Sequence, residues 1–220
     1  MLKFTFNSRD RRYLYYKLLK QPNKQLKSSL RCIKKMDVIE ALKTRRTVRQ
    51  FEPDYTIPRD QLQQIVDVAL ISPTGRNLQG LDLVVCTNRQ KLDEATKITF
   101  DSWPEDRRER WTNRKQDYGV KNVVTCDASC VIFLVSNERA DEQFLNVDAG
   151  IVSMAIMAAA REFDLHTMCI GALLWGDKAG LEASLGIETG KLVMAVAIGK
   201  AKEGFKVSDK QQLAKARFIE

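Results

Sequence analysis

Two short segments contain the side chains best suited to bind a ligand. Residues 45–51 (RRTVRQF) place three guanidinium groups within five positions, and residues 72–79 (SPTGRNLQ) form a small polar loop that carries two amides. Guanidinium groups bind phosphates and carboxylates through paired hydrogen bonds. Amides at alternate positions can read the hydrogen-bonding edge of a heterocycle. The two segments therefore predict two walls of a site for an anionic, planar cofactor.

Both segments also have a purely structural explanation. Arginines at the end of a helix are stabilised by the negative end of the helix dipole, and a proline and a glycine are enough to terminate a helix. After residue 46 the sequence alternates as in an extended chain, so Thr47 and Arg49 are expected on the same side. Helix termination does not require the amides of Asn77 and Gln79, and these favour a ligand.

The remaining sequence offers no evident catalytic group. His166 is the single histidine, and its place between a predicted helix and a predicted strand indicates a structural role. Neither GxGxxG nor GxxxxGK[ST] occurs, so the common dinucleotide and phosphate-loop motifs are lacking. Cys126 and Cys130 do not have the spacing of a zinc site, and the acidic residues form no evident acid–base pair. The chemistry is therefore expected to come from a bound cofactor, without a metal.

Composition and charge describe one globular domain with a basic extension. The 220 residues are 44% hydrophobic and 29% charged, which is ordinary for a soluble protein. The net charge of +8 is uneven: residues 1–35 contain eleven basic residues and one acid, so residues 36–220 carry a net charge of −2. A nucleic-acid surface on the main body is therefore not expected. Residues 1–35 are interpreted as an arm or helix packing on the domain or, alternatively, as a targeting segment.

The five cysteines indicate a reducing compartment. They are odd in number, form no CxxC pair and lie mostly in apolar stretches, so buried free thiols in a cytoplasmic protein are expected. The N-terminus lacks the apolar core of a secretory signal, and no apolar run approaches the length of a membrane span. Stable membrane insertion is therefore not expected.

Hydrophobic periodicity places both candidate segments at helix ends. Helices are predicted to begin at Asp37 and Pro58, so the arginine segment follows the first helix and the amide loop follows the second. The other predicted elements are helices near 89–99, over 144–162 and before Gly186, and strands over 81–86, 130–135, 167–170 and 192–199. The fully apolar strand 130–135 is expected at the centre of the sheet. The helix 144–162 is apolar on nearly all sides and is expected in the core or at a subunit interface.

Residues 100–121 fit neither a regular helix nor a strand. They combine Trp103, Trp111 and Tyr118 with many charged residues. Two explanations are open: a lid of aromatic side chains over a flat ligand, or aromatic anchors for an ordinary surface helix.

The order of these landmarks resembles the FMN-dependent nitroreductase family, from Met36 to the C-terminus. RRTVRQF is similar to the family's opening RRSxRxF, and SPTGRNLQ is similar to its APSxxNxQ. Three further matches follow in the family's order: Asp148-Ala149-Gly150 at the long apolar helix, Ile170-Gly171-Ala172 at the IGG motif, and Lys215-Ala216-Arg217 at the late basic residues.

This resemblance implies an α+β fold in residues 36–220, with a mixed central sheet flanked by helices and an intertwined homodimer holding two FMN molecules. One subunit would supply Arg45, Arg46, Thr47, Lys215 and Arg217 to the phosphate and ribityl chain, Arg49 to the pyrimidine edge, and Ile170, Gly171 and Ala172 to the ring. The other subunit would supply Pro73, Thr74, Gly75, Asn77 and Gln79.

The resemblance also implies the reaction. NAD(P)H would reduce FMN and leave, and a small-molecule acceptor such as a nitroaromatic compound or a quinone would then take two electrons. No residue of the protein would act as a catalytic nucleophile. The chain departs from the family at Gly80-Leu81, where Pro-Trp is frequent, and at Ala172, which replaces a glycine. Alternatives are a dehalogenase or flavin reductase with the same fold, or a dimeric protein whose basic arm binds nucleic acid or membrane.

Overall fold

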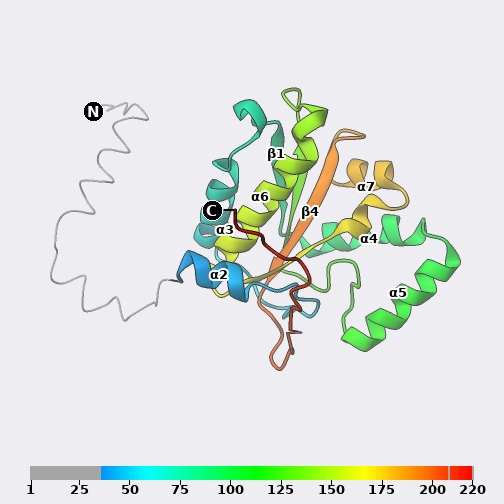
Figure 1. The fold of residues 1–220 in the computed structure, drawn as a ribbon. Helices are drawn as coiled ribbons and strands as arrows, with labels where there is room; N and C mark the ends of the chain where they lie inside the picture. The colour runs from blue at the N-terminus through cyan, green and yellow to red at the C-terminus, as the bar shows by residue number, and fades with distance from the viewer. Residues whose placement is uncertain (1–35, 208, 220) are drawn as a thin grey trace, which may run out of the picture. The chain divides into compact units, whose positions relative to one another are not determined.

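A four-stranded sheet lies at the centre of the unit formed by residues 36–220 (Figure 1). The computed structural model describes residues 36–207 and 209–219; residues 1–35, with Cys32 and the predicted basic arm, lie outside the described residues. The strands run in the order β1 (Leu81–Cys86), β2 (Cys130–Ser136), β4 (Leu192–Gly199) and β3 (His166–Cys169). The four predicted strands are therefore confirmed to within one residue at each end.

The direction of the strands corrects the expectation of a mixed sheet. Each neighbouring pair of these four strands is antiparallel. Within the described residues, the parallel pairing is an isolated bridge between Thr47 and Thr167. Strand direction depends on how the connections return to the sheet, and the hydrophobic pattern of a strand does not record it.

Strand β2 is buried on both faces, as predicted for a central strand. Cys130, Ile132 and Leu134 belong to the hydrophobic core on one side of the sheet, and Val131 and Phe133 belong to the core on the other side. All five are at most 1% exposed. Because neighbouring side chains in a strand point to opposite faces, a continuous apolar run indicates a layer of helices on each side.

Helices α3 (Arg59–Leu70) and α6 (Glu142–Glu162) pack against each other on one side of the sheet (Figure 1). The helix predicted to begin at Pro58 is confirmed, because Pro58 is the N-cap of α3. The helices contribute these residues to the core on this side: Leu62, Ile65, Ala69, Ala149, Val152, Ile156 and Ala160. The core location predicted for α6 is confirmed, although Val147 and Ile151 on the same helix are exposed.

Helix α6 is long and apolar enough, by length and composition alone, to cross a membrane. This corrects the expectation that no segment approaches such a length. Core helices of soluble proteins meet the same criteria, and α6 contacts α3, β3 and β4 in the fold. We therefore describe it as a core helix.

Helices α4 (Arg89–Asp101) and α7 (Lys178–Ser184) pack against each other and supply the core on the other side of the sheet. Both were expected, near residues 89–99 and before Gly186. Leu92 and Leu181 are buried there beside Trp103, which is 2% exposed.

A surface helix was one of the two explanations left open for residues 100–121, and α5 (Glu105–Tyr118) occupies most of this stretch. Apolar side chains recur at helical spacing when one face of a helix is buried. No residue of α5 is buried, so its sequence lacks this pattern. Only end signals mark the helix: Pro104 at the N-cap and Gly119, with a φ of 60°, at the C-cap.

The aromatic residues of this stretch anchor α5 to the core. The rings of Trp103 and Trp111 are 5.0 Å apart, and Trp103 Nε1 donates a hydrogen bond of 3.0 Å to the backbone oxygen of Trp175. The structure therefore supports the second explanation, aromatic anchors for a surface helix, over an irregular lid.

A short helix precedes the arginine segment, and another short helix lies within the amide loop. Asp37 Oδ1 accepts the N–H of Ile39 at 2.9 Å and caps α2 (Val38–Thr44), as expected for a helix that begins there. The amide loop contains a 3-10 helix, η1 (Gly75–Asn77), and residues 209–219 contain neither helix nor strand.

Candidate functional site

The arginine segment, residues 45–51, runs alongside strand β3. Thr47 forms the parallel bridge with Thr167, and Val48 N donates a hydrogen bond of 3.1 Å to Thr167 O. Val48 is fully buried, whereas Thr47 is half-buried and Arg49 is exposed. The predicted alternation is confirmed, so Thr47 and Arg49 lie on the side opposite to Val48.

Residues 170–172 continue directly from β3. Ile170 N donates a hydrogen bond of 2.8 Å to Ala195 O, and Gly171 begins a 3-10 helix, η2 (Gly171–Leu174). The arginine segment contacts β3 at Thr47 and Val48, and its other end forms an isolated antiparallel bridge between Phe51 and Ala201, beyond the end of β4. Residues 170–172 follow the opposite end of β3, so their place beside the arginine segment stays a prediction.

Arg45 lies against two sulfur atoms. Its Nη1 atom is 4.0 Å from Met157 Sδ on α6, and Cys169 Sγ is 3.8 Å from the same sulfur. The Nε atom of Arg45 is buried and has no hydrogen-bond partner within the described residues. A buried donor without an acceptor is unfavourable, and an oxygen of a bound ligand would satisfy it.

The side chain of Arg46 caps the C-terminal end of α2. Its Nη1 atom donates to the backbone oxygens of Lys43, at 2.7 Å, and Arg45, at 2.9 Å. These carbonyls belong to the C-terminal end of α2, so the side chain caps that helix. The structural explanation considered from the sequence therefore applies to Arg46, and its contact with a phosphate stays a prediction.

The arginine segment has an uncompensated positive charge. None of Arg45, Arg46 and Arg49 forms an ion pair with an acidic residue in the part of the chain that the structure describes. Three guanidinium groups within five residues attract an anion when no carboxylate neutralises them. Together with the unsatisfied Nε atom of Arg45, this donor set fits a phosphate-bearing ligand.

The amide loop, residues 72–79, has an unusual backbone. Arg76, Asn77 and Gln79 have φ angles of 53°, 55° and 53°, in the left-handed region that non-glycine residues avoid. Gln79 N donates to Thr74 Oγ1 at 3.0 Å, and Gln79 Nε2 donates to Asn77 Oδ1 at 3.3 Å. The loop therefore holds its two exposed amides beside each other.

Helix α6 separates the amide loop from the arginine segment. Gly75 N donates a hydrogen bond of 2.9 Å to Asp148 Oδ1, whereas Arg45 contacts Met157, nine residues further along α6. Nine residues advance about 14 Å along a helix. The two predicted walls therefore contact different parts of α6 and are not adjacent within one chain.

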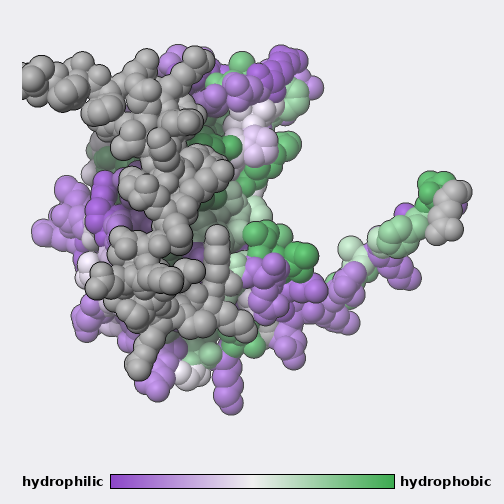
Figure 2. Space-filling view, turned by 90° about the vertical axis from the view of Figure 1, so that its left-hand side faces the viewer, coloured by the Kyte–Doolittle hydropathy of each residue, from purple (hydrophilic) through white to green (hydrophobic). Residues whose placement is uncertain are grey.

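The late basic residues lie on a projecting tail. Lys215 and Arg217 are exposed, and no hydrogen bond or ion pair within the described chain joins them to the arginine segment. Figure 2 shows the hydrophobic end of this tail standing away from the body, where Phe218 and Ile219 are 85% and 88% exposed.

The described cysteines are free thiols without a catalytic environment. Burial raises the pKa of Cys126 and the pKa of Cys130 to about 12, so both stay protonated at neutral pH. Desolvation of its sulfur by the surrounding protein atoms also raises the pKa of Cys169, although the charge of Arg45 acts in the opposite direction. Cys126 and Cys130 are buried as expected; Cys86 is half-buried, and Cys169 is exposed, contrary to the expectation.

His166 is paired with a cation. Its Nε2 atom is 3.0 Å from Arg161 Nη1, and because arginine can only donate, the imidazole must accept there in its neutral form. Burial lowers the pKa of His166, and the positive charge of Arg161 lowers it further. Among residues 36–207 and 209–219, no three His, Cys, Asp or Glu side chains are grouped to hold a metal ion.

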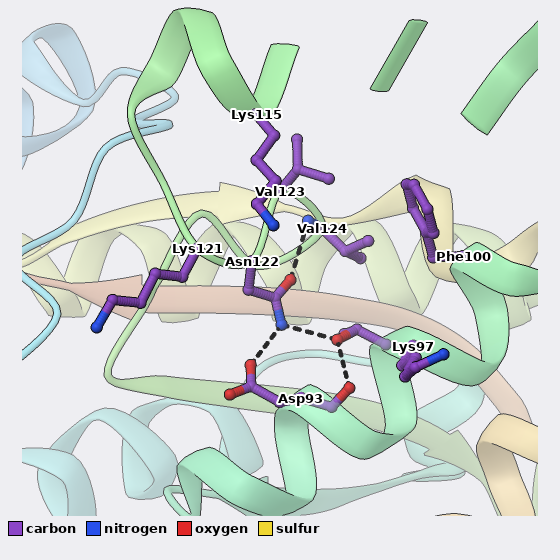
Figure 3. Close-up of a pocket in the computed structure, with 9 residues that line it drawn as sticks. Asp93, Lys97, Phe100, Lys115, Lys121, Asn122, Val123 and Val124 are labelled. Atoms are coloured by element: carbon purple, nitrogen blue, oxygen red, sulfur yellow. Dashed lines mark hydrogen bonds between the residues drawn. The ribbon is translucent and has the colours of Figure 1, made fainter. Parts of the chain in front are cut away.

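Three cavities are lined by residues outside the arginine segment. One of about 640 Å³ is lined by residues of the 53–62, 87–93 and 121–129 stretches. A cavity of about 280 Å³ lies between α4, α5 and the loop after α5 (Figure 3). A third, of about 230 Å³, reaches the amide loop at Thr74 and Gln79.

Asn122 is the polar centre of the cavity in Figure 3. Its Nδ2 atom donates to Asp93 Oδ1 and Thr96 Oγ1, both at 2.7 Å, and its Oδ1 atom accepts from the backbone N–H groups of Val124 and Thr125. The amide of Asn122 is fully used in holding the cavity wall, so it has no free hydrogen-bonding group for a ligand.

Two residues that hold the candidate segments in place, Asp148 outside them and Gln50 within the arginine segment, were not predicted as site residues. Asp148 accepts from the amide loop, and Gln50 Nε2 donates to Tyr118 O at 2.7 Å. A signal existed for Asp148, because an acid in a helix that is apolar on nearly all sides needs a partner. No comparable signal marks Gln50.

Sequence comparison connects the chain to known reductases. The profile of the Nitroreductase family matches residues 42–200. A "Putative NADH dehydrogenase/NAD(P)H nitroreductase" of Methanothermobacter thermautotrophicus is 26% identical to this chain over 144 residues. The matched region covers 66% of this chain and 63% of the relative, so less than two thirds of the relative's length is matched. A "CLA biosynthesis enone reductase" of Lactiplantibacillus plantarum is 27% identical over 190 residues, covering 75% of this chain and 86% of the relative.

Comparison of structures agrees on the fold. A nitroreductase with bound FMN from Desulfitobacterium hafniense superposes with a TM-score of 0.70 at 22% identity, covering 84% of this chain and 100% of that one. At this identity the likeness concerns the α+β fold, a four-stranded sheet flanked by helices. Because the family profile extends over most of the chain, from residue 42 to residue 200, the protein belongs to the nitroreductase family.

Proposed function

We propose that the protein is an FMN-dependent oxidoreductase that uses NADH or NADPH to reduce small-molecule acceptors. Membership of the nitroreductase family supports this class of reaction, and the name of the archaeal relative supports NAD(P)H as the electron donor. The observation that carries the proposal is the cluster of Arg45, Arg46 and Arg49, which has no acidic partner in the described chain. In the proposed complex, FMN supplies the two-electron redox chemistry.

The residues of the chain would bind and orient this cofactor. Arg45, Arg46 and Thr47 would hold the phosphate and ribityl chain, and Lys215 and Arg217 would complete the phosphate contacts. Arg49 would lie at the pyrimidine edge, where a cation stabilises the negative charge that the ring gains on reduction. Residues 170–172 (Ile170, Gly171 and Ala172) would lie against the ring.

A homodimer is part of the proposal, because the amide loop would come from the partner chain. It would contribute Pro73, Thr74, Gly75, Asn77 and Gln79. The separation of the amide loop and the arginine segment along α6 supports this arrangement. So do the exposed apolar side chains of α2, α6 and the tail, which need a covering surface: Val38, Ile39, Leu42, Val147, Ile151, Leu213, Phe218 and Ile219.

The acceptor has two candidate classes. Family membership supports nitroaromatic compounds and quinones. The 27% identity with an enone reductase supports an activated carbon–carbon double bond beside a ketone as the second candidate. Dehalogenation and reduction of free flavin would use the same site, so one acceptor screen distinguishes all of them.

The proposal is tested on the purified full-length protein. It should be yellow, or bind added FMN, and should oxidise NADH or NADPH only when an acceptor is present. The screen contains a nitroaromatic compound, a quinone, an α,β-unsaturated ketone, a halogenated phenol and free riboflavin. Colourless protein that does not bind added FMN would contradict the proposal.

We also propose that residues 1–35 form an arm outside the domain 36–220, in a cytoplasmic protein. The alternative, an arm that binds nucleic acid or an anionic membrane, follows from its charge of +10. Deletion of residues 1–35 separates the two: retention on heparin or on anionic vesicles should fall strongly only if the arm is a binding element.

A further inference from the structure

Helix α6 contains a buried carboxylate to which the proposed reaction gives no role. Asp148 is 6% exposed and lies near the start of a largely apolar helix. A buried carboxylate is unfavourable unless hydrogen bonds satisfy it. Its Oδ1 atom accepts the N–H of Gly75 at 2.9 Å, so the buried charge is used to join α6 to the amide loop.

Gly75 is also in close contact with the same face of α6. A Cβ atom on Gly75 would lie 2.4 Å from Cγ of Phe144, which leaves no room for a side chain. Phe144 precedes Asp148 by one helical turn, so both side chains lie on the same face of the helix. The ring of Phe144 and the carboxylate of Asp148 thus restrict Gly75 from two directions.

The next residue of the loop is fastened to the beginning of the helix. Arg76 Nη1 lies 3.1 Å from Oδ2 of Asp141, the N-cap of α6, and its guanidinium carbon lies 5.2 Å from the centre of the Phe144 ring. The side chain of Arg76 is therefore turned toward α6. Asn77 and Gln79, which follow it, are exposed.

These contacts explain how the loop keeps an unfavourable backbone. Three of its four residues from 76 to 79 are non-glycine residues with left-handed φ angles. Such a strained backbone persists only where several contacts with the surrounding structure stabilise it. The contacts with Asp148, Phe144 and Asp141 do so from the helix side, and leave the amides of Asn77 and Gln79 facing outward.

We propose that Asp148 is a positioning residue for the amide loop, and that its contact with Gly75 sets the shape in which Asn77 and Gln79 meet the flavin. The inference rests on the proposed function, in which this loop contributes to an FMN site. Asp148 itself touches no ligand in this proposal and acts through the backbone of Gly75.

Amide hydrogen exchange without FMN tests the contact itself. In Asp148→Ala, the N–H of Gly75 loses its acceptor, and its exchange should become at least about tenfold faster. Asp148→Asn keeps an oxygen at the same place and should stay within about threefold of the wild type. Ser153→Ala is the matched control, because Ser153 is 4% exposed on the same helix and its Oγ atom has no partner in the described chain.

Binding of FMN tests the positioning role. Asp148→Ala should raise the Kd for FMN about tenfold and change the circular dichroism of the bound flavin, while Asp148→Asn restores both. Arg76→Ala removes an exposed ion pair and should raise the Kd by a smaller factor, about twofold to fivefold. Because this substitution is at the surface, the test remains decisive even if Asp148→Ala does not fold.

The outcomes separate the two proposals. If the wild type does not bind FMN, the proposed function fails and the positioning role falls with it. If the wild type binds FMN and the Asp148→Ala and Arg76→Ala variants bind equally well with an unchanged flavin signal, only the positioning role is overturned. Faster exchange at Gly75 with an unchanged Kd also overturns it, because Asp148 would then support the loop without influencing the site.

Discussion

Gln50 Nε2 donates a hydrogen bond of 2.7 Å to the backbone oxygen of Tyr118, the last residue of α5. Gln50 belongs to the arginine segment. At the other end of α5, the guanidinium carbon of Arg107 lies 5.0 Å from the ring centre of Trp175, three residues after Ala172. One end of this helix is therefore joined to the arginine segment and the other end to Trp175, three residues after the stretch that we propose lies against FMN.

Loss of the Gln50 contact should loosen the C-terminal end of α5. In Gln50→Leu, Tyr118 O loses its side-chain donor, so amide exchange over residues 116–120 should become several-fold faster. Gln64→Leu is the matched control, because Gln64 Nε2 bonds to Asp60 O within its own helix, α3. Equal exchange in the wild type and Gln50→Leu would show that other contacts hold this end.

The proposed contacts of Arg45 and Arg49 with FMN predict a charge-specific loss of affinity. Arg45→Ala and Arg49→Ala should each raise the Kd for FMN about 10- to 100-fold, because a hydrogen bond to a charged group contributes about 1.5–3 kcal/mol. Fluorescence quenching of FMN on titration measures this. Lys91→Ala removes an exposed lysine on α4, whose described ion pair is with Glu94, and should leave the Kd unchanged. Unchanged affinity in both arginine variants would contradict these contacts.

Mixed dimers test whether each site takes the two segments from different chains. Subunits with Arg45→Ala and with Asn77→Ala are co-expressed with different tags, and the heterodimer is isolated. If each site combines Arg45 of one chain with Asn77 of the other, one site contains both substitutions and the other contains neither. The heterodimer should then bind one FMN with wild-type affinity. Two weakened sites, one with the affinity of Arg45→Ala and the other with that of Asn77→Ala, would place both residues of a site in the same chain.

Glu182 should stabilise the turn that leads into β4. Its carboxylate is 0% exposed and accepts the N–H groups of Gly190, at 2.7 Å, and Leu192, at 2.8 Å. Glu182→Ala leaves both donors without an acceptor and should lower the free energy of unfolding by about 2–4 kcal/mol. Urea denaturation measures the change. The exposed Glu188 on the same stretch is the control, and Glu188→Ala should stay within about 0.5 kcal/mol of the wild type.

The single histidine should make stability depend on pH. Burial and Arg161 lower the pKa of His166 in the folded protein below its usual 6.5. As the pH falls, the unfolded chain therefore binds a proton at His166 before the folded protein does. The free energy of unfolding is unaffected by protonation of this residue above pH 6.5 and decreases as the pH falls below 6.5. The free energy of unfolding should fall less steeply between pH 6.5 and 5 in His166→Gln. A pKa of 6.5 or higher for the imidazole, measured by NMR, would contradict this.

The hydrophobic pattern predicted the elements that form the two cores. The run from Cys130 to Val135 indicates a strand covered on both faces, because both sets of alternate side chains are apolar. Helix α5 could not be found in this way, since it buries no residue and only its ends carry signals. The direction of the strands could not be predicted from the hydrophobic pattern, because a strand buried on both faces is apolar throughout whether its neighbours are parallel or antiparallel.

The candidate site was predictable where local rules apply. The alternation of Thr47, Val48 and Arg49 indicated which side chains avoid the core, and the structure confirms it. The contact between Asp148 and Gly75 joins residues 73 positions apart, and a single sequence does not record which partner a buried acid finds. The capping role of Arg46 was one of the open alternatives, and only the fold distinguishes between them.

Helix α6 contacts the amide loop at Asp148 and the arginine segment at Met157, so one rigid element determines the spacing and the relative rotation of the two segments that we propose bind FMN. An insertion of a single residue between these positions would turn one surface against the other by about 100° and shift it by about 1.5 Å. Side-chain changes on this stretch can be absorbed locally, whereas changes in its length cannot. The protein is therefore expected to tolerate insertions in its loops far better than between residues 148 and 157.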